Sequence, residues 1–411
     1  MKWKLFLMDN IRHFDVVIVG SGIAGSALAS ALSGSGLSIA LIEAQPLNKA
    51  PLPSQVDINH FDARVSALTP RSQMFLQKID AWEGIASRRL RPYSHMTVWD
   101  AEGTGVIDFD CAEVGVPALG HIVENRVIVA SLLQRVQSAT DIVLLNPVKL
   151  ESCDVSASGG AFLALDSGET IHGDLLVAAD GAMSRIRTLL GFQTREWGYG
   201  HSAIVATVEL ERCHQNTAWQ RFLPTGPLAF LPLPGEGGRH YCSIVWSVSD
   251  SLVEGLLALE PQDFCADLER AFEHRLGKVL ACSARFGFPL RQRHAVDYVQ
   301  AGVALVADAA HTIHPLAGQG INLGLADVAV LAEEILSGYE RGASPGQLQL
   351  LKRYQRRRKS ENLTMMAAMD GFKALFEQSS LPIRLLRNAG MRTVGRLGPL
   401  KAQLMHRAMG L

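Results

Sequence analysis

The sequence lacks the features that mark several common protein classes. No stretch reaches about 18 consecutive apolar residues, which argues against a membrane-spanning helix. The six cysteines are scattered and form no CxxC pair, which argues against a zinc ribbon or a thioredoxin-type site and indicates reduced thiols. Neither a collagen period nor a repeat of about 20–50 residues is present. The first residues lack the apolar core and cleavage site of a signal peptide, so a cytoplasmic location is expected.

The chain does contain enough apolar material for a large core. Of its 411 residues, 48% are apolar and 19% are charged, a balance that excludes disorder as the overall state. At about 150 residues per domain, this length predicts two or three domains, or one large α/β domain with insertions.

A glycine-rich turn near the start of the chain has the spacing of a dinucleotide-binding site. The apolar run 15–19 predicts a buried parallel strand that leads into Gly20, Gly22 and Gly25. A helical pattern and a second strand follow, and this strand ends at Glu43. A diphosphate would bind free N–H groups at the helix N-terminus, and Glu43 would accept hydrogen bonds from ribose hydroxyls. The motif predicts dinucleotide binding without choosing between FAD and NAD.

Two later motifs each place an acid at the end of an apolar strand. The run 175–179 ends at Asp180, and Ser184 has the position of an N-cap for the next helix. Alone, this motif is more typical of an ordinary strand–turn–helix. A third strand ends at Asp308, and a glycine-rich loop then opens a helix. Such a loop offers free N–H groups to the anionic edge of a reduced flavin, and Asp308 can accept hydrogen bonds from ribitol.

In order and spacing, the three motifs resemble those of the single-component flavoprotein aromatic hydroxylases. The loop after Asp308 is most similar to that of the ubiquinone-biosynthesis hydroxylases, and the resemblance covers nearly the whole chain. It implies that the ADP half of FAD binds Gly20, Gly22, Ala24, Gly25 and Glu43. It implies further FAD contacts from Arg64, Arg126, Asp180, Asp308, Gly320, Ile321 and Asn322. The implied flavin-facing loop contains Pro315, Gly318, Gln319 and Gly320, and no catalytic side chain is assigned.

Two positions depart from the family pattern. Asn125 stands where many relatives in the wider superfamily carry an arginine that touches FAD, and Arg126 is next to it. Ala307 stands where the family usually has glycine, and its methyl group is expected to crowd a close backbone approach. We expect this change to weaken FAD retention without abolishing it.

The middle of the chain predicts a second sheet. Strand-like runs cover 203–210, 228–233 and 241–246, and proline and glycine separate them. In the family, such a sheet covers the flavin face and walls the substrate pocket. Three aromatic side chains are open to two interpretations, pocket lining or core, and core is favoured for each of Phe222, Phe230 and Trp246.

Two histidines in the third motif invite a general-base role. They are His311 and His314, and a hydrogen bond to the backbone is the favoured explanation for both. They do not sit at metal-ligand spacing with other donors, and no metal site is predicted.

The C-terminal part of the chain is strongly basic. Residues 341–411 contain 14 lysines and arginines and 3 acidic residues, although the whole chain has a net charge of −1. A basic run precedes a helical pattern, and it consists of Arg356, Arg357, Arg358 and Lys359. One interpretation is a helix pair packed on the FAD domain with a solvated basic face. The other is a dock for anionic lipid or an acidic partner.

Together these features predict an α/β fold with a doubly wound FAD-binding domain, a mixed-sheet substrate domain and a helical C-terminal segment. The predicted ranges are 1–75, 100–190 and 285–340 for the FAD-binding domain, 76–99 and 191–284 for the substrate domain, and 341–411 for the basic segment.

The resemblance implies a monooxygenase that uses bound FAD, NAD(P)H as a transient co-substrate and O2. The implied substrate is a polyprenylated phenol or quinol of ubiquinone biosynthesis, most specifically 2-polyprenylphenol at ring position 5. The alternatives are methoxy-benzoquinol hydroxylation in the same pathway and a non-catalytic FAD-carrying subunit of a lipid-synthesis assembly. We expect a homo-oligomer with no nucleic-acid partner. Peripheral contact with the inner membrane, or with ubiquinone-biosynthesis proteins, is expected through the basic segment.

Overall fold

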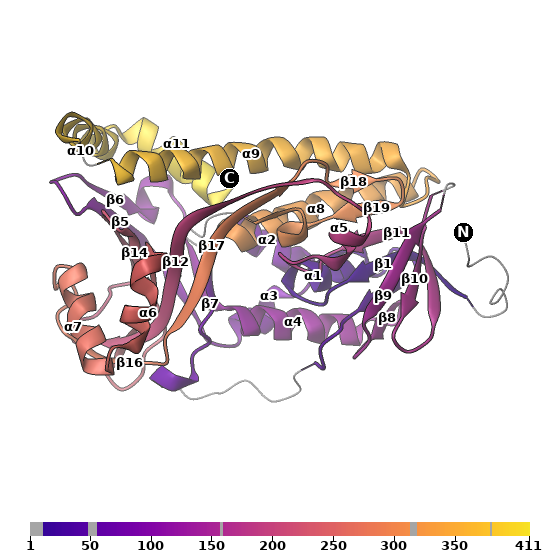
Figure 1. The fold of residues 1–411 in the computed structure, drawn as a ribbon, viewed down its shortest axis with the longest axis horizontal. Coiled ribbons are helices and arrows are strands. Elements are labelled where there is room, and N and C mark those ends of the chain that lie inside the picture. Colours follow the sequence, from indigo (N-terminus) through magenta and orange to yellow (C-terminus); the bar gives the residue numbers. More distant parts are fainter. Residues whose placement is uncertain (1–10, 48–55, 157–158, 313–318, 379) are drawn as a thin grey trace.

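The structure is a computed structural model that describes residues 11–47, 56–156, 159–312, 319–378 and 380–411. These residues form two large β-sheets that lie next to each other along the long axis of the molecule (Figure 1). A long helix, α9 (Leu348–Glu377), runs over both. The predicted α/β class with a helical C-terminal segment is confirmed.

The first sheet has a parallel centre. Its strands are β1 (Arg12–Val19), β2 (Ile39–Ile42), β8 (Ile142–Leu145), β9 (Leu150–Val155), β10 (Ala161–Leu165), β11 (Thr170–Ala178), β18 (Val299–Gln300) and β19 (Val303–Leu305). The strand order is β18-β19-β11-β1-β2-β8, and β10 and β9 extend from the start of β11. Because β19, β11, β1, β2 and β8 are parallel, their carboxyl ends meet at one edge of the sheet.

Three helices form the layer that covers this sheet. Helix α1 (Ile23–Leu32) packs against both α4 (Asn125–Ser138) and α8 (Gln319–Tyr339). The small and apolar side chains of α1 recur at helical spacing, and Ala27, Leu28 and Leu32 are fully buried. This is the helix that the glycine motif predicts.

The second sheet is mostly antiparallel and carries the predicted middle strands. Its strands are β5 (His95–Asp100), β6 (Val106–Asp110), β12 (Thr194–Leu210), β13 (Thr217–Leu223), β14 (Gly226–Pro232), β15 (His240–Ser249), β16 (Val279–Cys282), β17 (Phe286–Ala295) and β20 (His311–Thr312). The long strands β12 and β17 reach toward the first sheet (Figure 1). Helices α6 (Asp250–Ala258) and α7 (Pro261–Ala271) pack on this sheet.

The predicted aromatic residues divide between core and helix contacts. Phe230 is fully buried and stacks on Phe272, and Trp246 packs near Phe264 in the same core. Phe222 stacks on Phe376 of α9, with ring centroids 3.8 Å apart. Core is therefore the role that the structure gives Phe230 and Trp246.

Several short elements connect the two sheets. A small third sheet contains β3 (Val65–Leu68), β4 (Leu90–Tyr93) and β7 (Gly120–Glu124). Further helices are α2 (Pro70–Lys78), α3 (Trp82–Ala86) and α5 (Arg185–Leu189), with 3-10 helices η1 (Ile58–His60), η2 (Cys111–Val114) and η3 (Ala307–Ala309). The division into domains stays a prediction. Strands β6, β17 and β20 pair within the second sheet, although all three fall in the ranges predicted for FAD binding.

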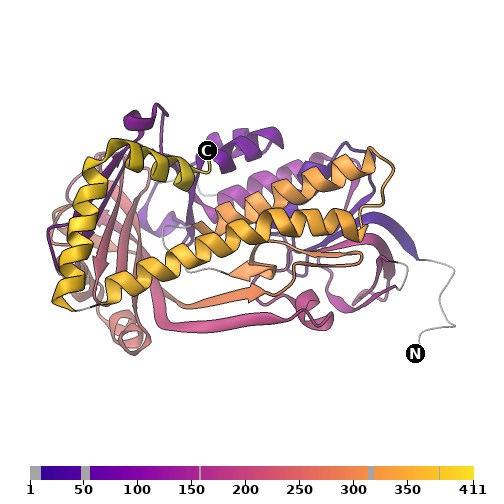
Figure 2. The same cartoon turned by 90° about the horizontal axis from the view of Figure 1, so that it is seen from above.

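The C-terminal segment forms three helices. After α9, helices α10 (Leu381–Arg396) and α11 (Gly398–Met409) turn back along the outer edge of the second sheet (Figure 2). Across the described part of the chain, no helix combines the length and the apolar character needed to cross a membrane.

The predicted basic run does not form the continuous anion-binding surface that its sequence suggests. Arg358 is buried against α8, and Lys359 donates to the Val296 carbonyl. Arg357 pairs with Glu333 and Glu334. The prediction of a lipid contact is wrong for Arg358, because this side chain is buried, and membrane contact through the rest of the basic segment stays a prediction.

Candidate functional site

The turn between β1 and α1 has the geometry that its glycine spacing predicts. Gly20 adopts a φ of +103°, and a Cβ there would lie 2.4 Å from the Ala179 carbonyl oxygen. A Cβ on Gly25 would lie 1.8 Å from the Gly20 oxygen. A Cβ on Gly22 would meet no atom within 4 Å, and no described side chain caps the start of α1. Gly20 and Gly25 therefore serve the packing of the chain, whereas Gly22 leaves space before a helix N-terminus that favours an anion.

Glu43 lies beside this turn at the end of β2. Its Oε2 accepts hydrogen bonds from the backbone N and the Oγ of Ser21, both at 2.9 Å. Its Oε1 accepts a third from Gln45 N at 2.8 Å. These bonds fix a half-buried carboxylate next to the helix N-terminus, where the sequence predicts a ribose-binding acid.

The strand order brings the distant motifs together. Gly20, Glu43, Asp180 and Asp308 follow β1, β2, β11 and β19, which are four consecutive strands of the sheet. All four residues lie at the carboxyl edge, because the strands are parallel. This edge is where open α/β sheets bind their ligands.

Asp180 combines a structural and a free carboxylate oxygen. Its Oδ2 accepts hydrogen bonds from Arg185 N and Ile186 N, at 2.7 and 3.2 Å, at the start of α5. Ser184 Oγ accepts from Arg187 N, so the predicted N-cap is confirmed. The other oxygen of Asp180, Oδ1, is buried and has no hydrogen-bond partner in the described residues. An unpaired buried acceptor is costly, so Oδ1 is suited to a ligand hydroxyl or amide.

Asp308 lies in η3, and its side chain is exposed. Desolvation by nearby protein raises the pKa of its carboxyl, while His311 and Arg64 oppose that shift. The Arg64 guanidinium lies 5.7 Å from the centre of the Phe288 ring, so Arg64 and Phe288 meet on the same side of the molecule as Asp308.

Ala307, the departure from the family pattern, is conformationally unusual. It has a φ of +52°, a left-handed conformation that glycine adopts without strain. Its N–H donates to Asp327 Oδ2 at 3.1 Å, which holds it in place. Gly324 of α8 faces it, because a Cβ on Gly324 would lie 2.8 Å from the Ala307 methyl. The methyl therefore costs backbone strain as well as space.

Arg126 has partners within the protein. Its Nε donates to Glu124 Oε2 at 2.9 Å, and Arg89 pairs with the other oxygen of the same buried carboxylate, also at 2.9 Å. Arg126 also donates to the His60 carbonyl. Asn125 accepts from Ser66 Oγ at 2.7 Å. These bonds hold the start of α4 against β3, and a contact from Arg126 to FAD stays a prediction.

Asn322 anchors the start of α8 to the loop before α2. Its Nδ2 donates to the Ala67 carbonyl at 2.8 Å, and its Oδ1 accepts from Thr69 N and Ser72 Oγ, at 3.0 and 2.7 Å. The buried side chain is thus fully engaged, and only its backbone is left for a cofactor, as the resemblance implies. Of the other predicted loop residues, Gln319, Gly320 and Ile321 begin α8. Pro315, Gly318 and His314 lie outside the described residues.

A buried polar network lies next to this site, and it was not predicted from the sequence. Asp327 Oδ2 lies 2.6 Å from His311 Nε2, and Asp327 Oδ1 accepts from Arg358 Nε at 2.8 Å. Burial alone would raise the pKa of Asp327, but His311 and Arg358 hold it at about 2. The available signal was a single acid within the otherwise uncharged stretch 321–332. The side chain of His311 is therefore buried against a carboxylate, and the favoured expectation of a hydrogen bond to the backbone is wrong for this residue, because Asp327 of α8 lies opposite its ring.

The residues present fit an FAD molecule. Gly22 leaves a cradle before α1 for a diphosphate, and Glu43 is fixed beside it. Asp180 and Asp308 offer acceptor oxygens along the same edge of the sheet. A dinucleotide with a ribitol linker needs the positive N-terminus of a helix for its diphosphate and acceptor oxygens for its hydroxyl groups.

Comparison with protein families supports the same cofactor. The FAD binding domain family matches residues 154–368, and an NAD(P)-binding Rossmann-like domain matches residues 18–47. The first of these covers the Asp180 and Asp308 motifs, and the second covers Gly20 to Glu43.

Solved structures show the same fold at low identity. A probable FAD-dependent monooxygenase, pqsL, from Pseudomonas aeruginosa has a TM-score of 0.76 and 20% identity, covering 93% of this chain and 100% of its own. The p-nitrophenol 4-monooxygenase PnpA from Pseudomonas putida has a TM-score of 0.78 and 16% identity, covering 97% and 99%.

Curated relatives match over nearly the whole chain. The 3-demethoxyubiquinol 3-hydroxylase of Escherichia coli is 36% identical, covering 97% of this chain and 98% of its own. The ubiquinone hydroxylase UbiL of Rhodospirillum rubrum is 38% identical, covering 96% and 89%. The human ubiquinone biosynthesis monooxygenase COQ6 is 33% identical, covering 98% and 94%. The chain therefore belongs to the FAD-dependent hydroxylases of ubiquinone biosynthesis and is a flavoprotein monooxygenase.

Proposed function

We propose that this enzyme uses NAD(P)H and O2 to hydroxylate the aromatic ring of a polyprenylated phenol or quinol. The observation that carries the proposal is the meeting of Gly20, Glu43, Asp180 and Asp308 at one edge of the first sheet. The names of the curated relatives support a substrate from the ubiquinone pathway.

Two substrates of this class are candidates. The resemblance of the C-terminal stretch favours 2-polyprenylphenol with attack at ring position 5. The similarity to a 3-demethoxyubiquinol 3-hydroxylase supports the methoxy-benzoquinol equally well. Both are electron-rich rings with an apolar tail, so the same pocket chemistry serves either.

The protein's own residues bind and orient the cofactor. The start of α1 would receive the diphosphate, Glu43 the adenosine ribose, and Asp180 and Asp308 the hydroxylated linker region. Bound FAD supplies the redox chemistry that couples NAD(P)H to O2. The second sheet would exclude water from the reacting ring, which suppresses side reactions.

The test is turnover by the purified protein. FAD-loaded protein is mixed with NADPH or NADH and a short-tailed 2-prenylphenol or methoxy-benzoquinol, and the product is identified by mass spectrometry. We expect one added oxygen atom on one of the two rings and faster flavin reduction when that ring is present. Flavin that NAD(P)H does not reduce under any of these conditions would contradict the proposal and favour the non-catalytic FAD-carrying subunit.

The polyprenyl tail determines where the substrate is found. Such a tail partitions into a bilayer, so the enzyme must meet its substrate at a membrane surface. Peripheral membrane association is therefore part of the proposal. Homo-oligomer formation stays a prediction, and size-exclusion chromatography with light scattering tests it.

A further inference from the structure

Helix α10 turns its apolar side outward. Leu381, Leu385 and Leu386 are 64%, 62% and 72% exposed, whereas Arg387 and Asn388 are buried. A surface helix ordinarily buries its apolar stripe and exposes its charges. The orientation of α10 is the reverse.

Specific polar contacts hold α10 in this orientation. Arg387 Nε and Nη2 donate to the two oxygens of Asp100, at 2.8 and 2.9 Å, and both side chains are about 1% exposed. Asn388 Nδ2 donates to the same carboxylate at 2.8 Å and its Oδ1 accepts from Gly105 N. Breaking a buried pair of this kind is costly, so α10 cannot roll to hide its leucines.

Helix α11 and the residues on either side of it also expose leucines. Lys401 is buried and pairs with Glu113 at 2.6 Å, and Met405 and Met409 pack inward. Leu400 and Leu404 of the same helix are 41% and 42% exposed. We call the whole set the leucine face: Leu381, Leu385, Leu386, Leu397, Leu400, Leu404 and Leu411.

Basic side chains accompany the leucine face. Residues 380–411 contain no aspartate or glutamate. Arg392, Arg396 and Arg407 are exposed, and none has an ion-pair partner in the part of the chain that the structure describes. Arg392 and Arg396 follow Leu385 at helical spacing (385, 389, 392, 396), so leucine and arginine share one side of α10.

We propose that the leucine face docks the enzyme on an anionic lipid bilayer. Leucine side chains would enter the headgroup region, and the three free arginines would contact lipid phosphates. The purpose of this contact, access to a polyprenylated ring, rests on the proposed function, whereas the contact itself is tested without turnover. The docking surface is thus α10 and α11, and not the basic run in α9.

The experiment is co-sedimentation of the FAD-loaded full chain with vesicles. The vesicles are pure phosphatidylcholine or a mixture with phosphatidylglycerol. We expect stronger binding to the anionic vesicles, and the preference should disappear at about 1 M salt, where the Debye length is about 3 Å. The triple variant Leu385→Gln, Leu386→Gln, Leu404→Gln should bind at least about ten-fold more weakly. The double variant Arg392→Gln, Arg396→Gln should lose the preference for anionic vesicles, because each arginine removed should weaken binding to these vesicles about five-fold.

Matched controls separate this surface from general apolar or charge effects. Leu252→Gln, Leu280→Gln changes two leucines that are 44% and 57% exposed elsewhere, and Arg356→Gln changes an exposed cation of the basic run. Both should bind vesicles like the parent. Equal binding by the triple leucine variant, or loss of binding in Arg356→Gln, would overturn the proposal. So would a parent that binds no vesicles and forms dimers that the triple variant loses, because the face would then join two copies.

Turnover of a short-tailed phenol distinguishes the two proposals. The triple leucine variant should retain its FAD content and its activity on this soluble substrate. If vesicle binding follows the pattern above while no variant or parent hydroxylates any ring, the docking surface stands and the proposed function fails.

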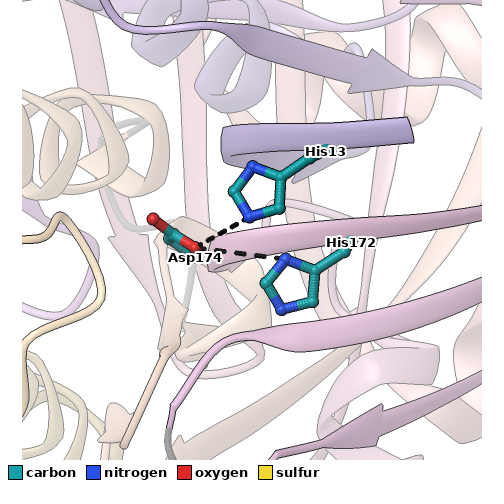
Figure 3. A group of neighbouring side chains, drawn as sticks. All are labelled: His13, His172 and Asp174. Carbon is teal, nitrogen blue, oxygen red and sulfur yellow. Dashed lines mark ion pairs between the residues drawn. The ribbon is translucent and has the colours of Figure 1, made fainter. Parts of the chain in front are cut away.

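A second observation concerns the opposite end of the first sheet. His13 and His172 are direct partners across β1 and β11, and Asp174 follows two residues later on the same side of β11 (Figure 3). His13 Nε2 lies 3.2 Å from Asp174 Oδ1, and His172 Nδ1 lies 4.0 Å from the same oxygen. The three ligand atoms are all within 4.8 Å of one another.

Two further features indicate that the cluster is arranged for a ligand. His172 Nδ1 is buried and has no hydrogen-bond partner in the described residues, and Phe162 packs on the ring at 4.5 Å. The seven residues from His13 to Gly20 span about 23 Å, so the cluster is remote from the FAD edge.

We propose that His13, His172 and Asp174 bind one Zn²⁺ ion, with water as the fourth ligand. Two imidazoles and a carboxylate are ligands that zinc accepts, and small side-chain shifts bring them to about 2.1 Å from a common centre. The ion would cross-link the amino ends of β1 and β11.

Calorimetric titration of EDTA-treated protein with ZnCl2 tests this site. We expect one site per chain, and Co²⁺ should give the absorption bands of a tetrahedral complex. His13→Gln and Asp174→Asn should each weaken binding at least about ten-fold. The control His274→Gln changes an exposed histidine that lies 3.6 Å from a single carboxylate, Glu269, and should bind zinc like the parent. Equal binding by His13→Gln and the parent would mean an adventitious ion only and would overturn the proposal.

Discussion

Arg358 and Asp327 form a fully buried ion pair between α9 and α8. Arg358 Nε lies 2.8 Å from Asp327 Oδ1, and the two side chains are 1% and 0% exposed. Asp327 also contacts His311 and accepts from Ala307 N, which lie on either side of Asp308. The pair therefore connects the C-terminal helix to the segment that carries a predicted cofactor acid.

Removing the arginine of this pair should destabilise the protein strongly. We expect Arg358→Met to lower the free energy of unfolding by about 3–5 kcal/mol, because it leaves Asp327 buried without its main partner. Denaturant unfolding followed by circular dichroism measures the change. Arg356→Gln, two residues away and exposed, should change stability by less than about 0.5 kcal/mol. Similar stability of Arg358→Met and the parent would contradict a structural role for the pair.

The two glycines Gly22 and Gly25 should respond differently to alanine. Gly22→Ala adds a methyl group to open space, so the protein should fold with a stability within about 1 kcal/mol of the parent. Its affinity for FAD should fall at least about ten-fold, because the methyl occupies the diphosphate space. Gly25→Ala places a Cβ 1.8 Å from the Gly20 oxygen and should disrupt folding itself. Thermal unfolding and FAD titration of the two variants give these quantities, and normal FAD affinity in Gly22→Ala would place the diphosphate elsewhere.

Glu43 should contribute directly to FAD affinity. Glu43→Ala should weaken FAD binding by about 1–3 kcal/mol, the cost of losing a charge-assisted hydrogen bond. Flavin fluorescence during titration measures the dissociation constant. Glu169→Gln changes a half-buried acid that pairs with Arg12; it is the control and should bind FAD like the parent. An unchanged dissociation constant in Glu43→Ala would remove this residue from the site.

Ala307→Gly should relieve local strain. The φ of +52° costs an alanine about 1–2 kcal/mol of stability. Glycine removes this strain, but its greater conformational freedom in the unfolded chain offsets about 0.5–1 kcal/mol of the gain. We therefore expect a gain in stability of up to about 1 kcal/mol and better FAD retention during gel filtration. Ala309→Gly, in the same 3-10 helix at a buried position without positive φ, should lose stability. Equal losses in both variants would show that the neighbours of Ala307 compensate for its conformation.

Stability should fall on acidification before the carboxylates titrate. Burial, with a smaller effect of His311, lowers the pKa of His294 to about 4 from an unfolded value near 6.5. As pH falls, the His294 imidazole therefore takes up a proton in the unfolded chain before it does so in the folded protein. The free energy of unfolding is not reduced by this effect above about pH 6.5, and it decreases as pH falls toward 4. The shift corresponds to about 3 kcal/mol. Urea unfolding of the parent and of His294→Gln at pH 7.5, 5.5 and 4.5 measures it, and a parallel pH dependence in the two proteins would exclude His294 as the cause.

The sequence by itself determined the β1–α1–β2 unit, since its signals are local. Gly20, Gly22, Gly25 and Glu43 lie within one contiguous strand–turn–helix–strand, where close backbone contacts require Gly20 and Gly25 and open space surrounds Gly22. The N-cap Ser184 was predictable for the same reason. The prediction that Asp180 and Asp308 bind the cofactor needed the resemblance, because a strand ending in an acid is common.

Only the tertiary structure decided which charges are free and which leucines are exposed. In the sequence, Arg356 and Arg358 belong to one basic run, but the partner of Arg358 is Asp327 on another helix, and Arg356 stays in solvent. The outward orientation of α10 depends on the pair between Arg387 and Asp100, which are 287 residues apart. Helical spacing specifies which residues share one side of a helix, and it cannot specify which side is buried. That choice is made by the partner that folding brings opposite the helix, and here the partner is a buried carboxylate.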